Sequence, residues 1–147
     1  VPSGNSVALY NLVRLARLTG RPDYERLVSD TASAFSRQVA SQPAAFTFFL
    51  SAMDMAIGPS QELVIVGDPD ADDTRSLLSV AREDYHPNLV VLLRPPGDAG
   101  QAIAESAPFT ESFDLLDGHA AAYLCSGFAC ERPVSEPAAL RDLLGDA

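Results

Sequence analysis

The chain has 147 residues, of which 47% are hydrophobic and 20% are charged, and its formal net charge is −10. This composition is typical of a globular protein and not of a disordered one. The acidic balance, with no Lys in the sequence, argues against binding to nucleic acid or to an anionic membrane surface, and no apolar run reaches the roughly 18 residues that cross a bilayer.

The first 58 residues predict antiparallel helices. Ser3 is a candidate N-cap for a helix whose apolar residues recur at helical spacing, and Gly20 is a candidate stop. A second helix is expected after Pro22, and the short link makes the two an antiparallel hairpin. A third follows Pro43. Because this third helix is apolar almost all round, we expect it to be buried on most sides.

Residues 59–147 predict a small α/β unit. The runs ELVIVG and NLVVLL are typical of strands, and the segment between them has helical periodicity. Strand, helix and strand in this order favour a parallel pair with a right-handed crossover. The runs AAYLC and FAC predict a hairpin, and a helix ends the chain. The predicted fold is therefore mixed α/β, with the helices of residues 1–58 packed on a small mixed sheet in residues 59–147.

The segment VGDPDADDT carries four aspartates after the first predicted strand. Its start is similar to a calcium loop, but Asp73 stands where that loop needs Gly, and Ser79 where it needs Glu. Acidic residues at a helix N-terminus explain the pattern through the helix dipole. His86 and His119 fall in predicted links without a helical metal-site partner. We therefore expect no metal site and no cofactor.

Both cysteines lie in the predicted hairpin, at Cys125 and Cys130. A turn at Gly127-Phe128 would place them directly opposite, and a turn at Ser126-Gly127 would place them diagonally on one face. Three interpretations stay open: two reduced cysteines acting as small apolar residues, a reversible redox pair, or a zinc site, which the lack of a second ligand pair disfavours.

The start of the first helix is a second candidate site. Ser3, Gly4 and Asn5 place a hydroxyl, an amide and backbone N–H groups at a helix N-terminus, where an anion or a sugar hydroxyl can bind. A plain helix cap explains the same residues.

Several motifs in order carry a family resemblance: PSGNS leading NLVRLARLTG, then ELVIVG, YHPNLVVL and AAYLCSGFACERPV. Together they resemble the C-terminal region of the large thioredoxin-domain-containing proteins related to the spermatogenesis-associated thioredoxin-like protein. The resemblance implies a parent with a thioredoxin-like domain and a helical toroid similar to six-hairpin glycosidases and N-acylglucosamine 2-epimerases. The first three helices would end that toroid, and Cys125 and Cys130 match the family's paired cysteines.

The resemblance implies a fragment, and the first residue, which is not Met, agrees with that. We expect a C-terminal structural and interaction module that is not catalytic alone and whose partner is the remainder of the parent chain, in the cytoplasm. The alternatives are a thiol redox role through Cys125 and Cys130, or part of a carbohydrate-active site near Ser3. A cut toroid exposes apolar faces, so the isolated piece is also expected to form homo-oligomers.

Overall fold

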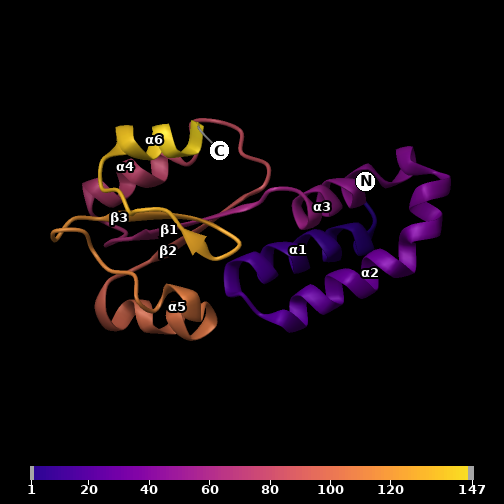
Figure 1. The fold of residues 1–147 in the computed structure, drawn as a ribbon, viewed down its shortest axis with the longest axis horizontal. Coiled ribbons are helices and arrows are strands. Elements are labelled where there is room, and N and C mark those ends of the chain that lie inside the picture. The colour runs from indigo at the N-terminus through magenta and orange to yellow at the C-terminus, as the bar shows by residue number, and fades with distance from the viewer. Residues whose placement is uncertain (1, 146–147) are drawn as a thin grey trace.

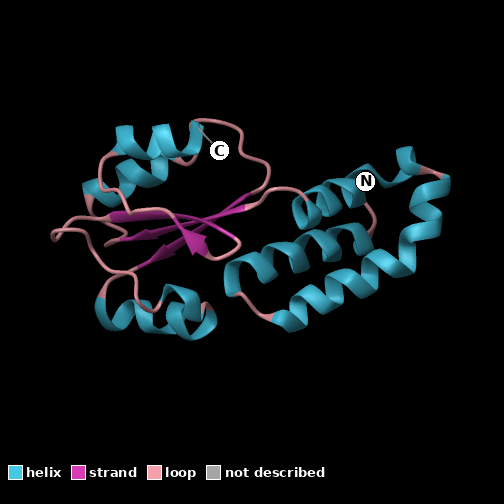
Figure 2. Ribbon diagram, viewed as in Figure 1, coloured by secondary structure: helices cyan, strands magenta, loops and turns pink. Residues whose placement is uncertain are grey.

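The computed structural model describes residues 2–145 and shows a mixed α/β protein. Within these residues, six α-helices accompany one four-stranded sheet. Figure 1 shows α1, α2 and α3 beside one end of the sheet, with α4 and α6 on one of its faces and α5 on the other. Figure 2 shows the same arrangement by secondary structure, which confirms the predicted fold class.

The N-terminal helices begin and end at the predicted signals. Helix α1 spans Gly4–Thr19, and the Ser3 side chain accepts the backbone N–H of Ser6 at its start. Gly20 ends α1 with a positive φ of 67°, a conformation that glycine adopts at little cost. Helix α2 spans Pro22–Ser41. A short 3₁₀ turn, Pro43–Phe46, then leads into α3, which spans Thr47–Ile57.

The sheet has the strand order β2-β1-β3-β4. Strands β1 (Gln61–Val66) and β2 (Leu89–Arg94) are parallel, and α4 (Asp72–Val80) connects them, so the predicted βαβ unit is confirmed. Strand β3 (Ala121–Ser126) pairs antiparallel with the other side of β1, and β4 (Ala129–Cys130) completes a hairpin with β3 at the sheet edge.

One face of the sheet is covered by α4 and by the last helix, α6 (Pro137–Gly145). Alternate residues of β1 and β3 point into this core, where they meet α4 and α6; the buried members are Leu63, Ile65, Leu77, Val80, Leu89, Ala120, Ala122, Leu124, Leu140 and Leu144. The opposite face carries Glu62, Val64 and Val66 of β1, because side chains alternate along a strand. There the chain runs through α5 (Gln101–Ser106), flanked by 3₁₀ turns at Gly97–Gly100 and Pro108–Thr110.

The helices form a second apolar cluster that includes one residue of the sheet, Val90 of β2. In α3 only one face is buried, through Phe49, Ala52 and Met55. The expectation that α3 is covered on most sides is therefore wrong: Ile57 is 80% exposed and Leu50 is also exposed. The physical reason is that α3 packs against α1, and the described residues leave its outer sides uncovered.

Candidate functional site: the cysteine hairpin and the helical groove

The two cysteines form a disulfide across the β3–β4 hairpin. Cys125 and Cys130 are register partners, so the chain takes the register in which the cysteines lie directly opposite. The interpretation as two reduced cysteines is wrong for this structure, because the tight hairpin brings the two side chains into bonding contact. Cys125 is 1% exposed, whereas Cys130 lies on the exposed edge strand. One cysteine is thus buried and the other is exposed.

The turn between the cysteines has positive φ at both central residues, 56° at Gly127 and 65° at Phe128. This is the backbone of a tight two-residue hairpin turn, a conformation that glycine adopts readily and that bulky side chains rarely adopt. Phe128 is held there by its contacts: its ring packs against Phe109 and lies over Gly20, where an added Cβ would stand 3.6 Å from the ring. The turn is therefore anchored to the link between α1 and α2.

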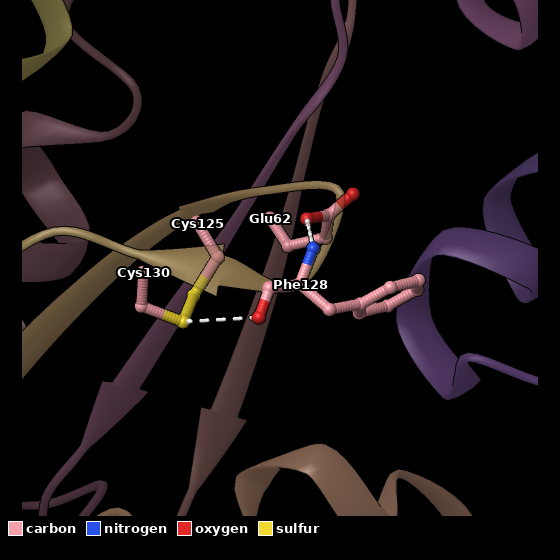
Figure 3. The surroundings of a disulfide bond; sticks show 4 residues. All are labelled: Glu62, Cys125, Phe128 and Cys130. Atoms are coloured by element: carbon pink, nitrogen blue, oxygen red, sulfur yellow. Dashed lines mark hydrogen bonds between the residues drawn. A yellow bond between two sulfur atoms is a disulfide. The ribbon is translucent and has the colours of Figure 1, made fainter.

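A buried carboxyl group lies beside the hairpin. Glu62, the second residue of β1, is 1% exposed and is the register partner of Cys125. Its Oε2 accepts the backbone N–H of Phe128 at 3.3 Å, and its Oε1 has no hydrogen-bond partner among the described residues. Figure 3 shows Glu62 next to Cys125, with the carboxyl group turned toward Phe128. Sequence reasoning overlooked Glu62, although a lone acid at the start of an apolar strand was a usable signal.

Burial raises the pKa of Glu62 above its ordinary value, because removing water penalises the charged form. The Phe128 N–H and the positive charge of Arg17 on α1 act in the opposite direction and are weaker. The folded state therefore binds a proton here more tightly than the unfolded state does. As a consequence, the contribution of Glu62 to stability is fully present below its unfolded pKa and is lost as pH rises through its folded pKa.

The Ser3–Asn5 helix start is used mainly as a cap. Besides accepting the Ser6 N–H, the Ser3 hydroxyl lies 2.9 Å from the Ser6 hydroxyl. Gly4 and Asn5 are exposed, and Ser3 and Ser6 border a small hollow of about 270 Å³ next to the start of α3. A sugar-binding role for Ser3, Gly4 and Asn5 stays a prediction, and these residues lie far along the chain from the cysteine hairpin.

An open groove with mainly apolar walls lies over α1, between α2 and α3, and is here called the helical groove. Its volume is about 320 Å³, and its walls are Val13, Ala16, Arg17, Glu25, Val28, Ser29, Ala32, Ser33, Met53, Ala56 and Ile57. Helix α2 forms one wall of the helical groove. None of its 20 residues, all described, is buried, although its apolar stripe faces α1.

On the other side of α1, a wider hollow of about 900 Å³ lies between the helices and the α4–β2 link. Asp54, the one charged residue of α3, is exposed there and accepts a hydrogen bond from the Asn88 side chain at 3.1 Å. His86 borders the same hollow. Among the described residues no hydrogen bond joins the His86 side chain to a hydroxyl or thiol group.

In the acidic segment after β1, the Asp73 carboxylate accepts two backbone hydrogen bonds. Its Oδ1 accepts the N–H of Thr74 at 2.8 Å, and its Oδ2 accepts the N–H of Ala120, the residue before β3, at 2.9 Å. These hydrogen bonds, with that of Ala120 the stronger influence, lower the pKa of Asp73. Within residues 2–145 no cluster of three or more His, Cys, Asp or Glu side chains could hold a metal ion.

Replacing Asp73 by Asn should lower the free energy of unfolding at pH 7 by about 1–2 kcal/mol, since the amide can accept only one of the two bonds and solvent partly screens the site. Because the folded pKa is depressed, the carboxylate's contribution is present above the unfolded pKa of about 3.9 and is lost as pH falls through the folded value. Urea unfolding of both proteins from pH 7 to about pH 3 measures this.

The matched control is Asp72→Asn. Asp72 is fully solvent-exposed and forms only a surface ion pair with Arg75, so its replacement should change stability by less than about 1 kcal/mol. A difference between Asp73→Asn and the natural protein that stays constant down to the lowest pH would contradict the assignment.

Comparison with known proteins finds relatives of this chain in mammals and in a nematode. Spermatogenesis-associated protein 20 from Rattus norvegicus and from Homo sapiens are each 34% identical to the chain over 143 residues, a match that covers 97% of the chain. The chain is homologous to this protein. An uncharacterized protein of Caenorhabditis elegans is 27% identical over 152 residues. No family model and no solved structure matches the chain.

The chain spans only a small part of these relatives. The match covers 18% of the rat and human spermatogenesis-associated protein 20 and 19% of the nematode protein. Homology to a much larger protein supports reading the chain as a module of a bigger protein. In residues 2–145 the structure contains no helix both long enough and apolar enough to span a membrane.

Proposed function

We propose that this chain is a C-terminal structural and interaction module of a larger protein, without catalytic activity of its own. The observation that carries the proposal is α2, a 20-residue helix with an apolar stripe and no buried residue among those described. A helix that forms one side of an open apolar groove is stable in a larger assembly, where a second surface covers it.

The occupant of the helical groove is the remainder of the parent chain. The relatives extend over more than five times the matched segment, since the match covers 18% of their length. By the family resemblance, the uncovered helices α1 to α3 would close a toroid, and the preceding helices of that toroid would lie in the groove. Burying apolar surface there stabilises the contact by about 25 cal/mol for each Å².

Site-specific labelling tests this occupant. Ile57, at the rim of the groove, and Tyr85, outside it, are 80% and 87% exposed, so cysteines placed at either position should react with a maleimide at similar rates in this chain. In the full-length parent, Ile57→Cys should react at least about tenfold more slowly, because labelling then requires local opening. Tyr85→Cys serves as the matched control.

The outcome separates three cases. Slow labelling at Ile57→Cys in the parent supports the proposal, and equal rates at both positions in the parent contradict it. Slowing in this chain that grows with protein concentration, with a dimer mass in light scattering, would mean that a second copy occupies the groove instead.

A second candidate function is thiol–disulfide exchange, and one observation favours it: Cys130 lies on an exposed edge strand. A thiolate can therefore attack the Cys130 sulfur directly. If the protein resides in a reducing cytoplasm, as its composition predicts, such a pair cycles between dithiol and disulfide. Counting reactive thiols in the native protein, with and without prior reduction, tests this, and a disulfide that resists reduction in the native state contradicts it.

A further inference from the structure

The packing of the sheet does not require an acidic side chain at the buried position of Glu62. Glu62 is an acidic residue with 1% exposure on the central strand β1, and its Oε1 lacks a hydrogen-bond partner in the described part of the chain. A buried carboxyl group that is only half satisfied costs stability, and an apolar residue would fill the same place at less cost. A functional role for Glu62 would account for this cost in stability.

The position of Glu62 relative to the disulfide suggests the role. Glu62 and Cys125 are directly opposite on the antiparallel pair β1–β3, so their side chains emerge on the same face, with Cβ atoms about 4.5–5.5 Å apart. Both side chains are 1% exposed. Figure 3 shows the carboxyl group turned toward the Phe128 N–H, so proton transfer to the Cys125 sulfur requires the Glu62 side chain to change its torsion angles.

Because Cys130 is exposed and Cys125 is buried, reduction of the disulfide is helped by a proton donor beside the Cys125 sulfur. Attack by an external thiolate is open at the exposed Cys130 sulfur, which makes Cys125 the leaving group. A thiolate released in an apolar, water-poor place is unstable, because burial penalises the charged form and raises the pKa of a thiol. Exchange is faster when the departing sulfur is stabilised as it leaves.

We propose that Glu62 is the proton donor to Cys125 when the disulfide is reduced, and the proton acceptor from Cys125 when it re-forms. This inference rests on the thiol–disulfide exchange proposed above. Besides Cys125, the groups that face Glu62 are the Phe128 N–H of the hairpin and the cation of Arg17 on α1, while its partner on β2 is the apolar Val90.

The reaction balances with a thiol as reductant. The reductant thiolate attacks the Cys130 sulfur, the S–S bond breaks, and the Cys125 sulfur leaves with the electron pair and takes the proton of the Glu62 carboxyl group. A second thiolate then attacks the reductant sulfur of the mixed disulfide and releases Cys130 as a thiolate, which takes a proton from solvent. Two thiols are oxidised to one disulfide, the protein disulfide is reduced to two thiols, and Glu62 regains its proton from solvent.

Burial raises the pKa of Glu62, and this supports the assignment because it favours the protonated form that a proton donor requires. Donation is available below the folded pKa and disappears above it, where the group is a carboxylate. The advantage that Glu62 gives should therefore be large at low pH and decline as pH rises through that value.

The test compares the natural protein with Glu62→Gln. The glutamine keeps an oxygen that accepts the Phe128 N–H and has nearly the same volume, but it cannot give a proton. Rates of reduction by dithiothreitol are measured for both proteins between about pH 5 and pH 8. Because the reductant is the same, its own ionisation cancels in the ratio of the two rates at each pH.

The expected ratio is about tenfold to a hundredfold where Glu62 is protonated and falls toward one as pH rises through its folded pKa. A ratio within about twofold across the whole range overturns the inference and leaves the exchange proposal standing. If the disulfide of the natural protein is not reduced under native conditions, both proposals fail, so the two failures are distinguishable.

A second variant keeps the inference testable if Glu62→Gln does not fold. Arg17→Gln removes a cation that lowers the pKa of Glu62, so the pH at which the reduction rate loses its acid-assisted part should move upward. A purely structural role for Glu62 would not move this midpoint, and an unchanged midpoint overturns the assignment.

Discussion

Replacing Leu77 by Ala is expected to lower the free energy of unfolding by about 2–5 kcal/mol. Leu77 lies on α4 with 0% exposure, and it packs in the core between the sheet and the helices α4 and α6. Truncation removes buried methyl groups and leaves a cavity between α4, α6 and the sheet. Urea unfolding followed by circular dichroism measures the loss.

The control is Ile57→Ala, a truncation of similar size at a residue that is 80% exposed in this chain. Its cost should stay within about 0.5 kcal/mol, because little apolar contact is lost. If the two variants were equally stable, the core described for the sheet would be wrong. In the full-length parent, by contrast, the proposed covering of the helical groove makes Ile57→Ala costly as well.

Replacing Cys130 by Ser should lower the free energy of unfolding by about 2 kcal/mol, as estimated from the chain entropy of the unfolded state. The disulfide joins residues with a sequence separation of 5, a short loop for which the entropic gain is near the lower end of the usual range. Cys130 is exposed, so serine adds no buried polar group at this position. The measurement is urea unfolding without reductant.

Reductant supplies the internal check. Dithiothreitol should destabilise the natural protein by a similar amount and should have no effect on Cys130→Ser, which has no disulfide to lose. If reductant shifted the unfolding of both proteins equally, the stabilisation would not come from the Cys125–Cys130 bond.

Most of the secondary structure could be predicted from local patterns. The Ser3 cap and the Gly20 stop bound α1 as expected, because capping depends on a few neighbouring residues. The apolar runs at β1 and β2 formed a parallel pair because the helix between them leaves little choice of connection. The predicted division at residue 58 stays a prediction.

The candidate site was only partly predictable. The sequence placed Cys125 and Cys130 in one hairpin but left two registers open, and the register depended on Phe128 adopting a positive φ. That conformation is supported by contacts of Phe128 with Phe109, Gly20 and Glu62, which come from three distant parts of the chain. Local propensity carries no information about such contacts, and it disfavours Phe in this backbone region.

The amino-acid sequence by itself determined the order of helices and strands, the βαβ connection and the placement of both cysteines in one hairpin, since each depends on residues close in the chain. Only the tertiary structure decided that β3 joins β1 rather than β2, that Glu62 is buried opposite Cys125, and that one side of α2 and α3 is left uncovered. These outcomes depend on which distant surfaces meet, and burial, which sets the protonation of Glu62 and the accessibility of each sulfur, exists only once those surfaces have packed.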